Sequence, residues 1–492
     1  MDYYLGIDIG TSTAKFTVID QNGSVVFSCR QEYQYLQPQT GWREIWPEVW
    51  VEAVKKGLNE LLTAVERKNV KAIGISGQMH TTVFLDEFGN CIRPAIMWND
   101  VRTKEYFPKL KSLLTQEDTR AISAIISTGS PAVNLLWLKD YESENFGKLK
   151  KFLVGPDYLV YYLTGNYATD YCQASTSSLY DVRSREWSRT MRELIGLPEE
   201  VYPAVKGSQE IAGVLREELQ NEFQLLPNVK VVVGTGDNCA SAVATGSLQN
   251  GYPVLSIGTS GVLVLPKGKS KEDSKGKEIL FSLDGKRVSS LTQGVVQSAG
   301  GSYEWFGKQI LGIDDFNDLI KEISTAEPAG SQLLFYPHIN GDKTIYADSS
   351  LRGAFIGLSL SDTREDLALA VMEGVSFAFK QLIQEMDLSL ENLSQLMVTG
   401  GGANSEIWMQ LLADILNIRI ARLECNEGAS YGAATLAMNA MEISLNATGN
   451  AVMSVNFGRC FEPRTYHVEL YLKKYEKYLR IYDGMKMIDP LF

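Results

Sequence analysis

The chain contains few of the residues that build metal or thiol chemistry. Its 492 residues include only six cysteines and three histidines. The cysteines are scattered and form no Cys-x-x-Cys pair, which argues against a zinc site and against a disulfide framework. A reduced, cytoplasmic setting fits this usage better. The histidines are far apart in the sequence, and no Ser-His-Asp or Cys-His arrangement has a local signature.

Basic residues and long apolar runs are also scarce. The chain has 47 Lys and Arg residues against 59 Asp and Glu residues, a net charge of −12. This balance argues against a nucleic-acid partner, which would require a basic surface. The N-terminus has no basic segment, and no stretch is apolar for long enough to cross a bilayer, so we expect neither a signal peptide nor a membrane span. A chain of this length predicts at least two domains.

What the sequence does contain, at its N-terminus, is a strand, a loop of small residues and a second strand. Tyr3 to Ile7 is predicted as a buried strand and Lys15 to Asp20 as another, with Gly10, Thr11 and Ser12 between them. Glycine lets a backbone approach a ligand closely. Exposed N–H groups and hydroxyls in such a loop suit the oxygens of a phosphate group. The stretch is therefore a candidate phosphate loop.

The same arrangement recurs halfway along the chain. An apolar strand beginning at Val254 ends in the bend Gly258-Thr259-Ser260, and another strand follows. Gly258 lies 248 positions after Gly10. A motif repeated at half length predicts two similarly built α/β domains, each presenting a phosphate loop to a shared cleft. We expect these domains to comprise residues 1–244 and 245–492.

Two aspartates follow buried strands. Asp8 directly precedes the first loop, where Mg²⁺ held through a carboxylate, waters and phosphate oxygens would explain it; a hydrogen-bonded aspartate at a bend is the alternative. Asp237 follows the strand Val229 to Val233 in a Gly-x-Gly-Asp-Asn turn, a position where ligands bind in α/β folds. It could accept a hydroxyl proton from a substrate, or serve only as a turn former or helix N-cap.

Two further strand ends carry candidate binding residues. Gln78, Met79 and His80 could hydrogen-bond to and pack against a polyol or sugar, although a structural histidine is the alternative reading. Gly400-Gly401-Gly402, between a predicted strand and a predicted helix, would let adenine and ribose lie against bare backbone. The chemistry most consistent with all these features is phosphoryl transfer, which depends mainly on positioning, Mg²⁺ and charge stabilisation, with one base to orient the acceptor hydroxyl.

Taken together, the motifs resemble the FGGY carbohydrate kinases, and within them the xylulokinases, over nearly the whole chain. Asp8 to Ser12 and Gly258 to Gly261 are similar to the two phosphate motifs of this family. Gly77 to His80 is similar to its sugar motif, Gly236 to Asn238 to the motif of its catalytic aspartate, and Gly400 to Gly402 to its adenosine region.

The resemblance implies two ribonuclease-H-like domains of the actin and hexokinase type, with a catalytic cleft between them. It implies Mg-ATP as the donor and a ketopentose, first of all D-xylulose, as the acceptor that is converted to its 5-phosphate. Asp237 would be the general base, and Asp8 and Asp237 would lie at the metal. The implied sugar-binding residues are Gln78, Met79, His80, Trp98, Asp237 and Asn238. The implied nucleotide-binding residues are Gly10, Thr11, Ser12, Lys15, Gly258, Thr259, Gly300, Gly401 and Asn404.

Three positions depart from the resemblance. Thr81 stands where xylulokinases usually have glycine, and Asn134 where the family's N-terminal signature usually has lysine. Lys343 lies in a segment where the family commonly has Gly-Glu-Arg-x-Pro. Thr81 could reshape the sugar pocket, because one extra methyl group can shift selectivity by ~1–3 kcal/mol.

Two alternatives remain open from the sequence. Within the family, the acceptor could instead be gluconate, ribulose or a deoxy-sugar. From another class, the chain could be a nucleotide-switched regulatory protein that binds a sugar, although a sensor has no need of the base Asp237. We expect a small-molecule substrate, no nucleic-acid or membrane partner, and a homodimer as the default assembly.

Overall fold

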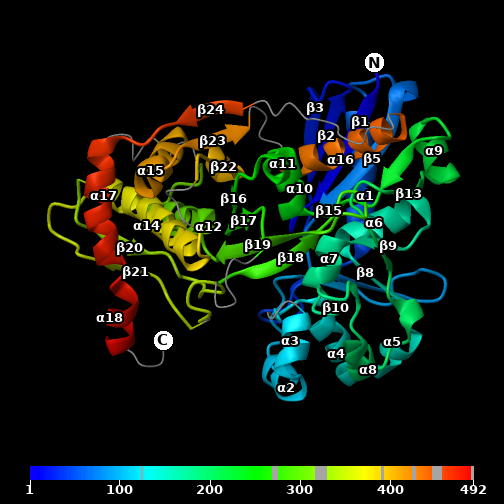
Figure 1. Ribbon diagram of the computed structural model, residues 1–492, viewed down its shortest axis with the longest axis horizontal. Helices are drawn as coiled ribbons and strands as arrows, with labels where there is room; N and C mark the ends of the chain where they lie inside the picture. The colour runs from blue at the N-terminus through cyan, green and yellow to red at the C-terminus, as the bar shows by residue number, and fades with distance from the viewer. Residues whose placement is uncertain are drawn as a thin grey trace. The chain divides into compact units, whose positions relative to one another are not determined.

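The computed structural model describes residues 1–122, 126–268, 275–315, 328, 330–348, 350–388, 393–423, 428–445 and 457–488 (Figure 1). The chain divides into two compact units, which are described one at a time. The first comprises Met1–Ala244, Lys277–Leu291 and Glu427–Ser454, and the second comprises Thr245–Gly276, Thr292–Asn426 and Val455–Phe492. The assignment of functional domains to residues 1–244 and 245–492 stays a prediction.

The main sheet of the first unit is mixed. Its strand order is β13–β14–β5–β1–β2–β3, and β15 also pairs with β5. β1 runs antiparallel to β2 and parallel to β5. The bounds are β1 Tyr3–Ile9, β2 Thr13–Asp20, β3 Val25–Glu32, β5 Val70–Gly77, β13 Ile211–Val214, β14 Lys230–Val232 and β15 Thr235–Gly236. The predicted strand, loop and strand at the N-terminus is confirmed.

Helices cover both faces of this sheet. Side chains of adjacent strand residues point to opposite faces. Phe16 of β2 lies against Gly57 of α1 (Pro47–Leu61), whereas the Thr17 hydroxyl hydrogen-bonds the Ser430 hydroxyl of α16 (Gly428–Leu445) at 2.7 Å. The two helices therefore lie on opposite faces, which explains why six of the seven residues of β1 are buried.

Helix α16 lies close against the sheet because the facing positions have no side chains. A Cβ added at Gly6 or at Gly74 would collide with the carbonyl oxygens of Ser430 and Ala433. The Tyr431 hydroxyl also donates to the Gly23 carbonyl oxygen at 3.0 Å. A helix from the C-terminal third of the sequence thus completes the core of the first unit.

Residues 91 to 230 contribute several helices and a second core to the first unit. The same unit contains a small sheet of order β4–β7–β6–β8, with bounds Glu44–Ile45, Ala95–Ile96, Thr82–Leu85 and Lys151–Val154 in that order. The buried side chains of this core include Phe84, Leu135, Trp137 and Phe152. The helices are α2 Tyr106–Leu113, α3 Gln116–Ala121, α4 Pro131–Tyr141, α5 Ser143–Lys148, α6 Gly155–Thr164, α7 Tyr171–Thr176, α8 Arg189–Ile195 and α9 Glu217–Phe223.

The second unit repeats the plan of the first. β16 (Val254–Ile257) runs antiparallel to β17 (Gly261–Leu265) and parallel to β22 (Leu396–Thr399). Within this unit the order is β19–β17–β16–β22–β23–β24, where β19 is Ser289–Val296, β23 is Ile420–Leu423 and β24 is Phe457–Phe461. The predicted repeat of a strand, a loop of small residues and a strand is therefore confirmed, as is the α/β class.

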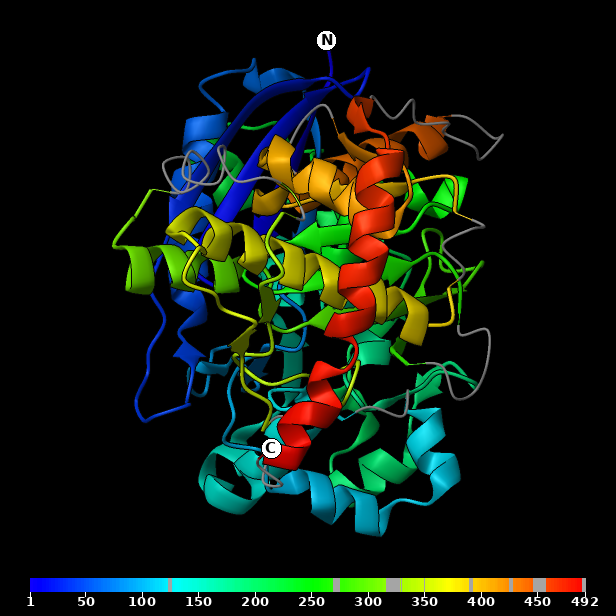
Figure 2. The ribbon, with the colours of Figure 1, turned by 90° about the vertical axis from the view of Figure 1, so that its left-hand side faces the viewer.

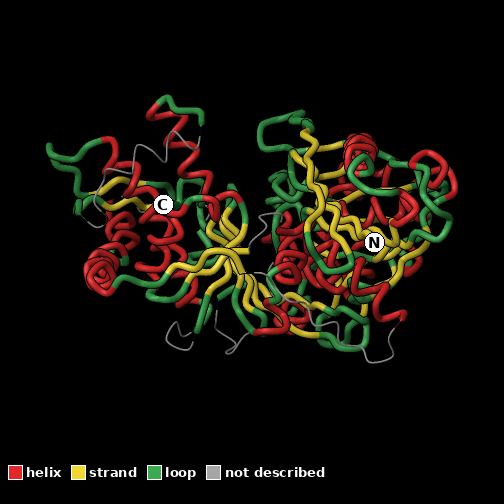
Figure 3. The backbone as a smooth tube through the Cα atoms, turned by 90° about the horizontal axis from the view of Figure 1, so that it is seen from above, coloured by secondary structure: helices red, strands yellow, loops and turns green. Residues whose placement is uncertain are grey.

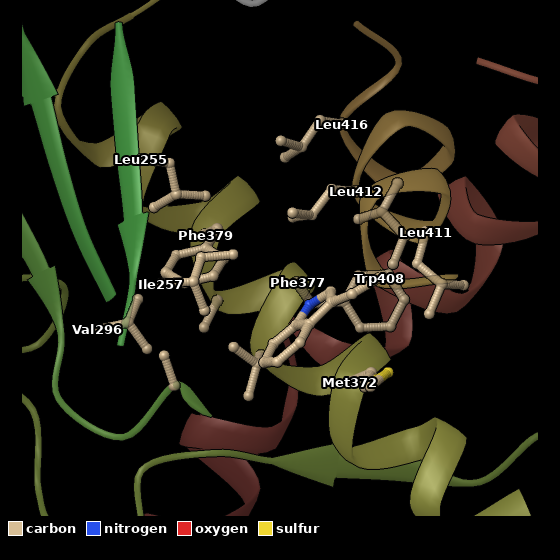
Figure 4. Close-up of a cluster of buried hydrophobic side chains, with 14 of the residues drawn as sticks. Leu255, Ile257, Val296, Met372, Phe377, Phe379, Trp408, Leu411, Leu412 and Leu416 are labelled. Atoms are coloured by element: carbon tan, nitrogen blue, oxygen red, sulfur yellow. The ribbon is translucent and has the colours of Figure 1, made fainter. Parts of the chain in front are cut away.

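The core of the second unit lies between β16 and the helices α14 (Arg364–Glu385) and α15 (Glu406–Leu416). Figure 4 shows Leu255 and Ile257 of β16 facing Phe379 of α14, with Trp408 and Leu412 of α15 in the same buried cluster. The strands of each sheet have helices beside them (Figure 3). The same layering in both units is what the alternation of strands and helices in the sequence predicts.

A late helix, α17 (Thr465–Tyr478), packs on α14 and α15. Figure 2 shows α17 crossing α14, and the Tyr471 hydroxyl donates to Glu373 Oε1 of α14 at 2.9 Å. The Tyr475 and Tyr478 side chains are also buried. Within the described residues, none of the helices combines the length and the apolar character needed to cross a membrane.

Candidate active site

The carboxyl ends of three parallel strands meet at one edge of the first unit's sheet. Asp8 of β1 is in register with Ser76 of β5, and Ser76 is in register with Thr235 of β15. Asp237 follows β15 at once as the first residue of α10 (Asp237–Ala244). The carboxyl ends of parallel strands are where α/β folds bind ligands. The two aspartates singled out in the sequence are thus gathered at the expected edge.

The two carboxyl groups differ in their surroundings. Asp8 is buried and accepts a hydrogen bond from Ser76 Oγ at 3.0 Å. Burial raises the pKa of Asp8, while the charge of Lys15 and the Ser76 hydrogen bond lower it. Burial, together with the charge of Asp8, raises the pKa of Asp237 to about 7, against the 2.8 Å hydrogen bond from Asn238 N. A carboxyl group that titrates near neutral pH suits a general base.

The loop at Gly10, which is predicted to bind phosphate, is held in place through its carbonyl groups. Gly10 N donates to Thr13 O at 3.0 Å and closes the bend. Tyr33 holds the loop twice, with its hydroxyl donating to Gly10 O at 2.6 Å and its N–H donating to Ser12 O at 2.9 Å. Ser12 and Lys15 are exposed, so their side chains can meet a ligand. Tyr33 is 23 positions from Gly10, and no local pattern marks it.

The predicted sugar motif forms a tight turn beside Asp237. His80 has a φ of 71°, and Thr81 N donates to Met79 O at 2.9 Å. Asn238 Nδ2 lies 3.5 Å from Met79 Sδ, and a Cβ at Gly236 would lie 2.6 Å from Met79 Cγ. The segments around Met79 and Asp237 are therefore in direct contact, although they are more than 150 positions apart in the sequence.

Gln78 and Trp98 extend this site. The Gln78 side chain is buried, and its amide oxygen and nitrogen have no hydrogen-bond partner within the described residues. An unpaired buried amide costs ~1–3 kcal/mol, so the hydroxyls of a ligand would relieve it. Trp98 Nε1 donates to Thr11 Oγ1 at 3.1 Å, and Trp98 N donates to Thr81 Oγ1 at 3.2 Å. Trp98 thus links the end of the turn that carries the predicted sugar motif to the loop at Gly10.

Asp170 was not predicted as a site residue, yet it holds the strand that precedes Asp237. It is buried, and it accepts hydrogen bonds from Thr235 Oγ1 at 2.6 Å, Ser208 Oγ at 3.1 Å and Gln173 N at 2.9 Å. Burial raises the pKa of Asp170 to about 6, although these hydrogen bonds lower it. Asp170 ends β9 (Ala168–Asp170) directly before α7, and this position between a strand and a helix was the only feature of the sequence that could have indicated its role.

The second unit contains a cavity of about 430 Å³, a size suited to a small-molecule ligand. It is lined by all five residues of this half that the resemblance implies for nucleotide binding, namely Gly258, Thr259, Gly300, Gly401 and Asn404. The remaining lining residues are Ile257, Glu304, Lys308, Ile313, Asp314, Asp315, Gly402 and Trp408. The charged residues in this list belong to no recognisable sequence motif, so the sequence did not predict them as part of the site.

The glycines that line this cavity, and the neighbouring Gly400, have different structural roles. Gly400 has a φ of 87°, which favours glycine, and a Cβ at Gly402 would lie 2.5 Å from Ile257 Cγ2. A Cβ at Gly300 would lie 2.5 Å from Gly258 O, to which Gly300 N donates at 2.9 Å. A Cβ at Gly401, in contrast, would meet no atom within 4 Å. Gly401 therefore leaves its space open at the cavity wall.

Comparison with known proteins agrees with this geometry. Residues 3–244 match the N-terminal domain of the FGGY family of carbohydrate kinases, and residues 254–441 match its C-terminal domain. The chain is 32% identical to the xylulose kinase of Staphylococcus xylosus, over 98% of this chain and 99% of that protein. It is also 32% identical to the xylulose kinase of Bacillus subtilis, over 99% of this chain and 98% of that protein.

A solved structure is similar as well. The crystal structure of a "xyloylose kinase" from Brucella ovis has a TM-score of 0.88 and 31% identity, and the match covers 99% of this chain and 100% of that one. The two domain matches, the full-length relatives and the repeated pattern of strand, loop and strand agree with one another. The chain therefore belongs to the FGGY family of carbohydrate kinases and is a sugar kinase that uses ATP.

Proposed function

We propose that this kinase phosphorylates the terminal hydroxyl of a ketopentose, D-xylulose, to give D-xylulose 5-phosphate. The observation that carries the proposal is the contact between the turn at Met79 and Asn238, the residue next to Asp237. The pKa of the Asp237 carboxyl group is raised to about 7. The full-length relatives named xylulose kinase support the choice of sugar. Asp237 is the general base, and Gln78, Met79, His80, Trp98 and Asn238 bind the sugar.

In the proposed reaction, Asp237 takes the proton of the acceptor hydroxyl. The sugar oxygen then forms a bond to the γ-phosphorus of ATP, and the bond from that phosphorus to the ADP oxygen breaks. A pKa near 7 leaves a substantial fraction of Asp237 ionised at neutral pH and keeps it basic enough to hold the proton. The buried Gln78 amide offers one donor group and one acceptor oxygen for sugar hydroxyls.

The nucleotide is proposed to occupy the cavity of the second unit. Gly401 leaves room for a flat base and ribose, and Asn404 offers an amide at the same wall. The backbone N–H groups of the Gly258-Thr259 loop are suited to phosphate oxygens. In the first unit, Gly10, Thr11, Ser12 and Lys15 are proposed to serve the phosphates as well.

Asp8 and Asp237 are proposed to hold Mg²⁺. Both supply the carboxylate oxygens that this ion prefers, and the charge of Asp8 raises the pKa of Asp237, a repulsion that a cation would offset. Within the described residues, no group of three or more His, Cys, Asp and Glu side chains could hold a metal ion, so water and phosphate oxygens would complete the shell. When bound, Mg²⁺ stabilises the charge of the transferring phosphoryl group.

The experiment that tests the sugar is ADP release from Mg-ATP across a panel of acceptors. The panel contains D-xylulose, L-xylulose, D-ribulose, L-ribulose, gluconate, glycerol, erythritol and rhamnulose, with a blank that lacks sugar. A D-xylulose rate well above all others supports the proposal. A preference for another sugar keeps the kinase and rejects the ketopentose, and rates equal to the blank reject the whole acceptor class.

A homodimer in a reduced cytoplasmic compartment is proposed for the assembly and its setting. The five cysteines within the described residues are free thiols, which fits a reducing environment. Homodimers are the commonest assembly of soluble oligomers. Light scattering coupled to gel filtration, without reductant and with it, measures the mass: a monomer mass rejects the dimer, and a mass that changes with reductant rejects the thiol assignment.

A further inference from the structure

The turn formed by Met79, His80 and Thr81 is strained. His80 has a φ of 71° in the left-handed region, and Thr81 N donates to Met79 O at 2.9 Å across it. A residue other than glycine is unfavourable in such a conformation, which persists only where the surrounding structure holds it. The structure should therefore contain groups that fix this turn.

The first such group is the hydroxyl of Thr81. Thr81 is fully buried, and its Oγ1 accepts a hydrogen bond from Trp98 N at 3.2 Å. Its carbonyl oxygen accepts from Gly155 N at 3.0 Å, at the start of α6. One end of the turn is thereby tied both to the Trp98 segment and to a helix.

The second group is the side-chain amide of Asn134, which is connected to the turn through the Thr82 hydroxyl. Thr82 Oγ1 donates to His80 O at 3.0 Å and accepts from Asn134 Nδ2 at 2.8 Å. Asn134, on α4, is fully buried and also donates to Gly129 O at 2.9 Å. Its own Oδ1 has no hydrogen-bond partner within the described residues. The burial of an unpaired oxygen is unfavourable, so the position is explained by the two hydrogen bonds that the amide donates.

Thr81 and Asn134 are two of the three positions at which the sequence departs from the pattern it resembles, and both hold the same turn. A glycine at position 81 would have no hydroxyl to accept from Trp98 N. We propose that Thr81 and Asn134 are positioning residues that together orient Met79 and His80 toward the acceptor and so set which sugar this chain prefers. This inference rests on the proposed function of Met79 and His80 as sugar-binding residues.

The test compares variants that remove these hydrogen bonds while keeping the side-chain volume nearly unchanged. They are Thr81→Val, Asn134→Leu and the double variant. The matched control is Thr17→Val, which also removes a buried hydroxyl, the one bonded to Ser430 at 2.7 Å on the sheet face of α16. Each protein is assayed over the sugar panel with KM for ATP, KM for the sugar, kcat and Tm.

We expect Thr81→Val and Asn134→Leu each to raise the sugar KM by about tenfold and to change the ranking of the sugars. Thr81→Val removes the hydrogen bond from Trp98 N, Asn134→Leu removes the two that the amide donates, and in each case the strained turn relaxes. The ATP KM stays within about twofold of wild type, because the cavity of the second unit is untouched. The double variant loses less than the product of the single losses, since both act on one turn. Thr81→Ser, which keeps the hydroxyl, retains the wild-type ranking.

Two results would overturn the inference. In one, Thr81→Val and Asn134→Leu lower Tm but match Thr17→Val in sugar KM and ranking. In the other, Thr81→Ser loses as much as Thr81→Val. Thr81→Ala removes the same hydroxyl and carries the test if the valine variant does not fold. If wild type shows no sugar-dependent ADP release, the proposed function and this inference fail together. If wild type turns over a sugar but Thr81→Val and Asn134→Leu match the control Thr17→Val in sugar KM and ranking, this inference alone fails.

Discussion

The carboxyl group of Asp237 lies close enough to Asp8 for the charge on Asp8 to raise its pKa. The two residues are 229 positions apart, and the parallel pairing of β1, β5 and β15 brings them together. A base and a candidate metal ligand that influence each other electrostatically should share their pH dependence. The first three predictions follow from this pair.

Replacement of Asp237 by Asn should lower turnover strongly and leave nucleotide binding unchanged. The amide cannot accept the acceptor proton, and loss of a general base typically lowers kcat by about 10²–10⁴-fold. Nucleotide affinity, measured by calorimetry with ADP, should remain near wild type because the cavity of the second unit is intact. Asp86→Asn, which alters only the turn that Asp86 caps, is the control. Turnover within tenfold of wild type would remove Asp237 from the role of base.

In the protein without Mg²⁺ and nucleotide, the carboxyl group of Asp237 should titrate near pH 7, because burial and the charge of Asp8 raise its pKa to about 7. In Asp8→Asn the nearby negative charge is absent, so the pKa of Asp237 falls and the inflection should move to lower pH. Infrared difference titration of the carboxyl band between pH 5 and 9, with Asp237→Asn to assign the band, measures both values. An inflection that stays at the same pH in the variant would contradict the coupling.

Stability should fall as pH rises through the same range. The folded-state pKa of Asp237 lies above its ordinary value of 3.8, so the folded state binds the proton more tightly than the unfolded chain does. The contribution of protonated Asp237 to the free energy of unfolding is fully present below about pH 4 and is lost as pH rises to about 7. Urea unfolding at pH 4.5, 6 and 7.5 measures it in wild type and Asp237→Asn. The variant should lose less free energy of unfolding over this interval, and an equal loss would contradict the assignment.

Thr235→Val should lower kcat more than it raises the sugar KM. It removes the 2.6 Å hydrogen bond to the buried Asp170 and loosens the strand that ends at Asp237. We expect a loss of ~1–3 kcal/mol in the free energy of unfolding and about tenfold in kcat. Ser208→Ala is the matched control, since it removes another hydrogen bond from the same carboxyl oxygen of Asp170, at 3.1 Å. If both variants lose stability and neither loses turnover, Asp170 serves the fold alone.

Gly401→Val should weaken ATP binding and leave stability nearly unchanged. No atom lies within 4 Å of a Cβ at Gly401, so the new side chain enters the cavity without a clash. The ATP KM should rise by about tenfold or more, while the sugar KM stays constant. Gly484→Val is the control, because Gly484 in α18 (Ile481–Ile488) also has no neighbour within 4 Å and does not line the cavity. An unchanged ATP KM would place the nucleotide elsewhere.

The sequence by itself determined the local elements of both units and most of the candidate site. The loop at Gly10 and its repeat at Gly258 could be predicted because glycine and small hydroxyl residues between apolar strands reflect local backbone geometry. The Gly400 to Gly402 segment and the turn before Asp237 could be predicted for the same reason. Hydrophobic period and turn residues act over a few positions, and the printed sequence contains that information directly.

Only the tertiary structure decided which of these pieces meet. That α16 returns to the first unit depends on the fit of Ser430 and Ala433 against bare positions at Gly6 and Gly74, far away in the sequence. The hold on His80 by Thr81 and Asn134 depends on hydrogen bonds between separate elements. Such contacts are set by the packing of whole helices and strands, and the order of residues within one element carries no record of its distant neighbours.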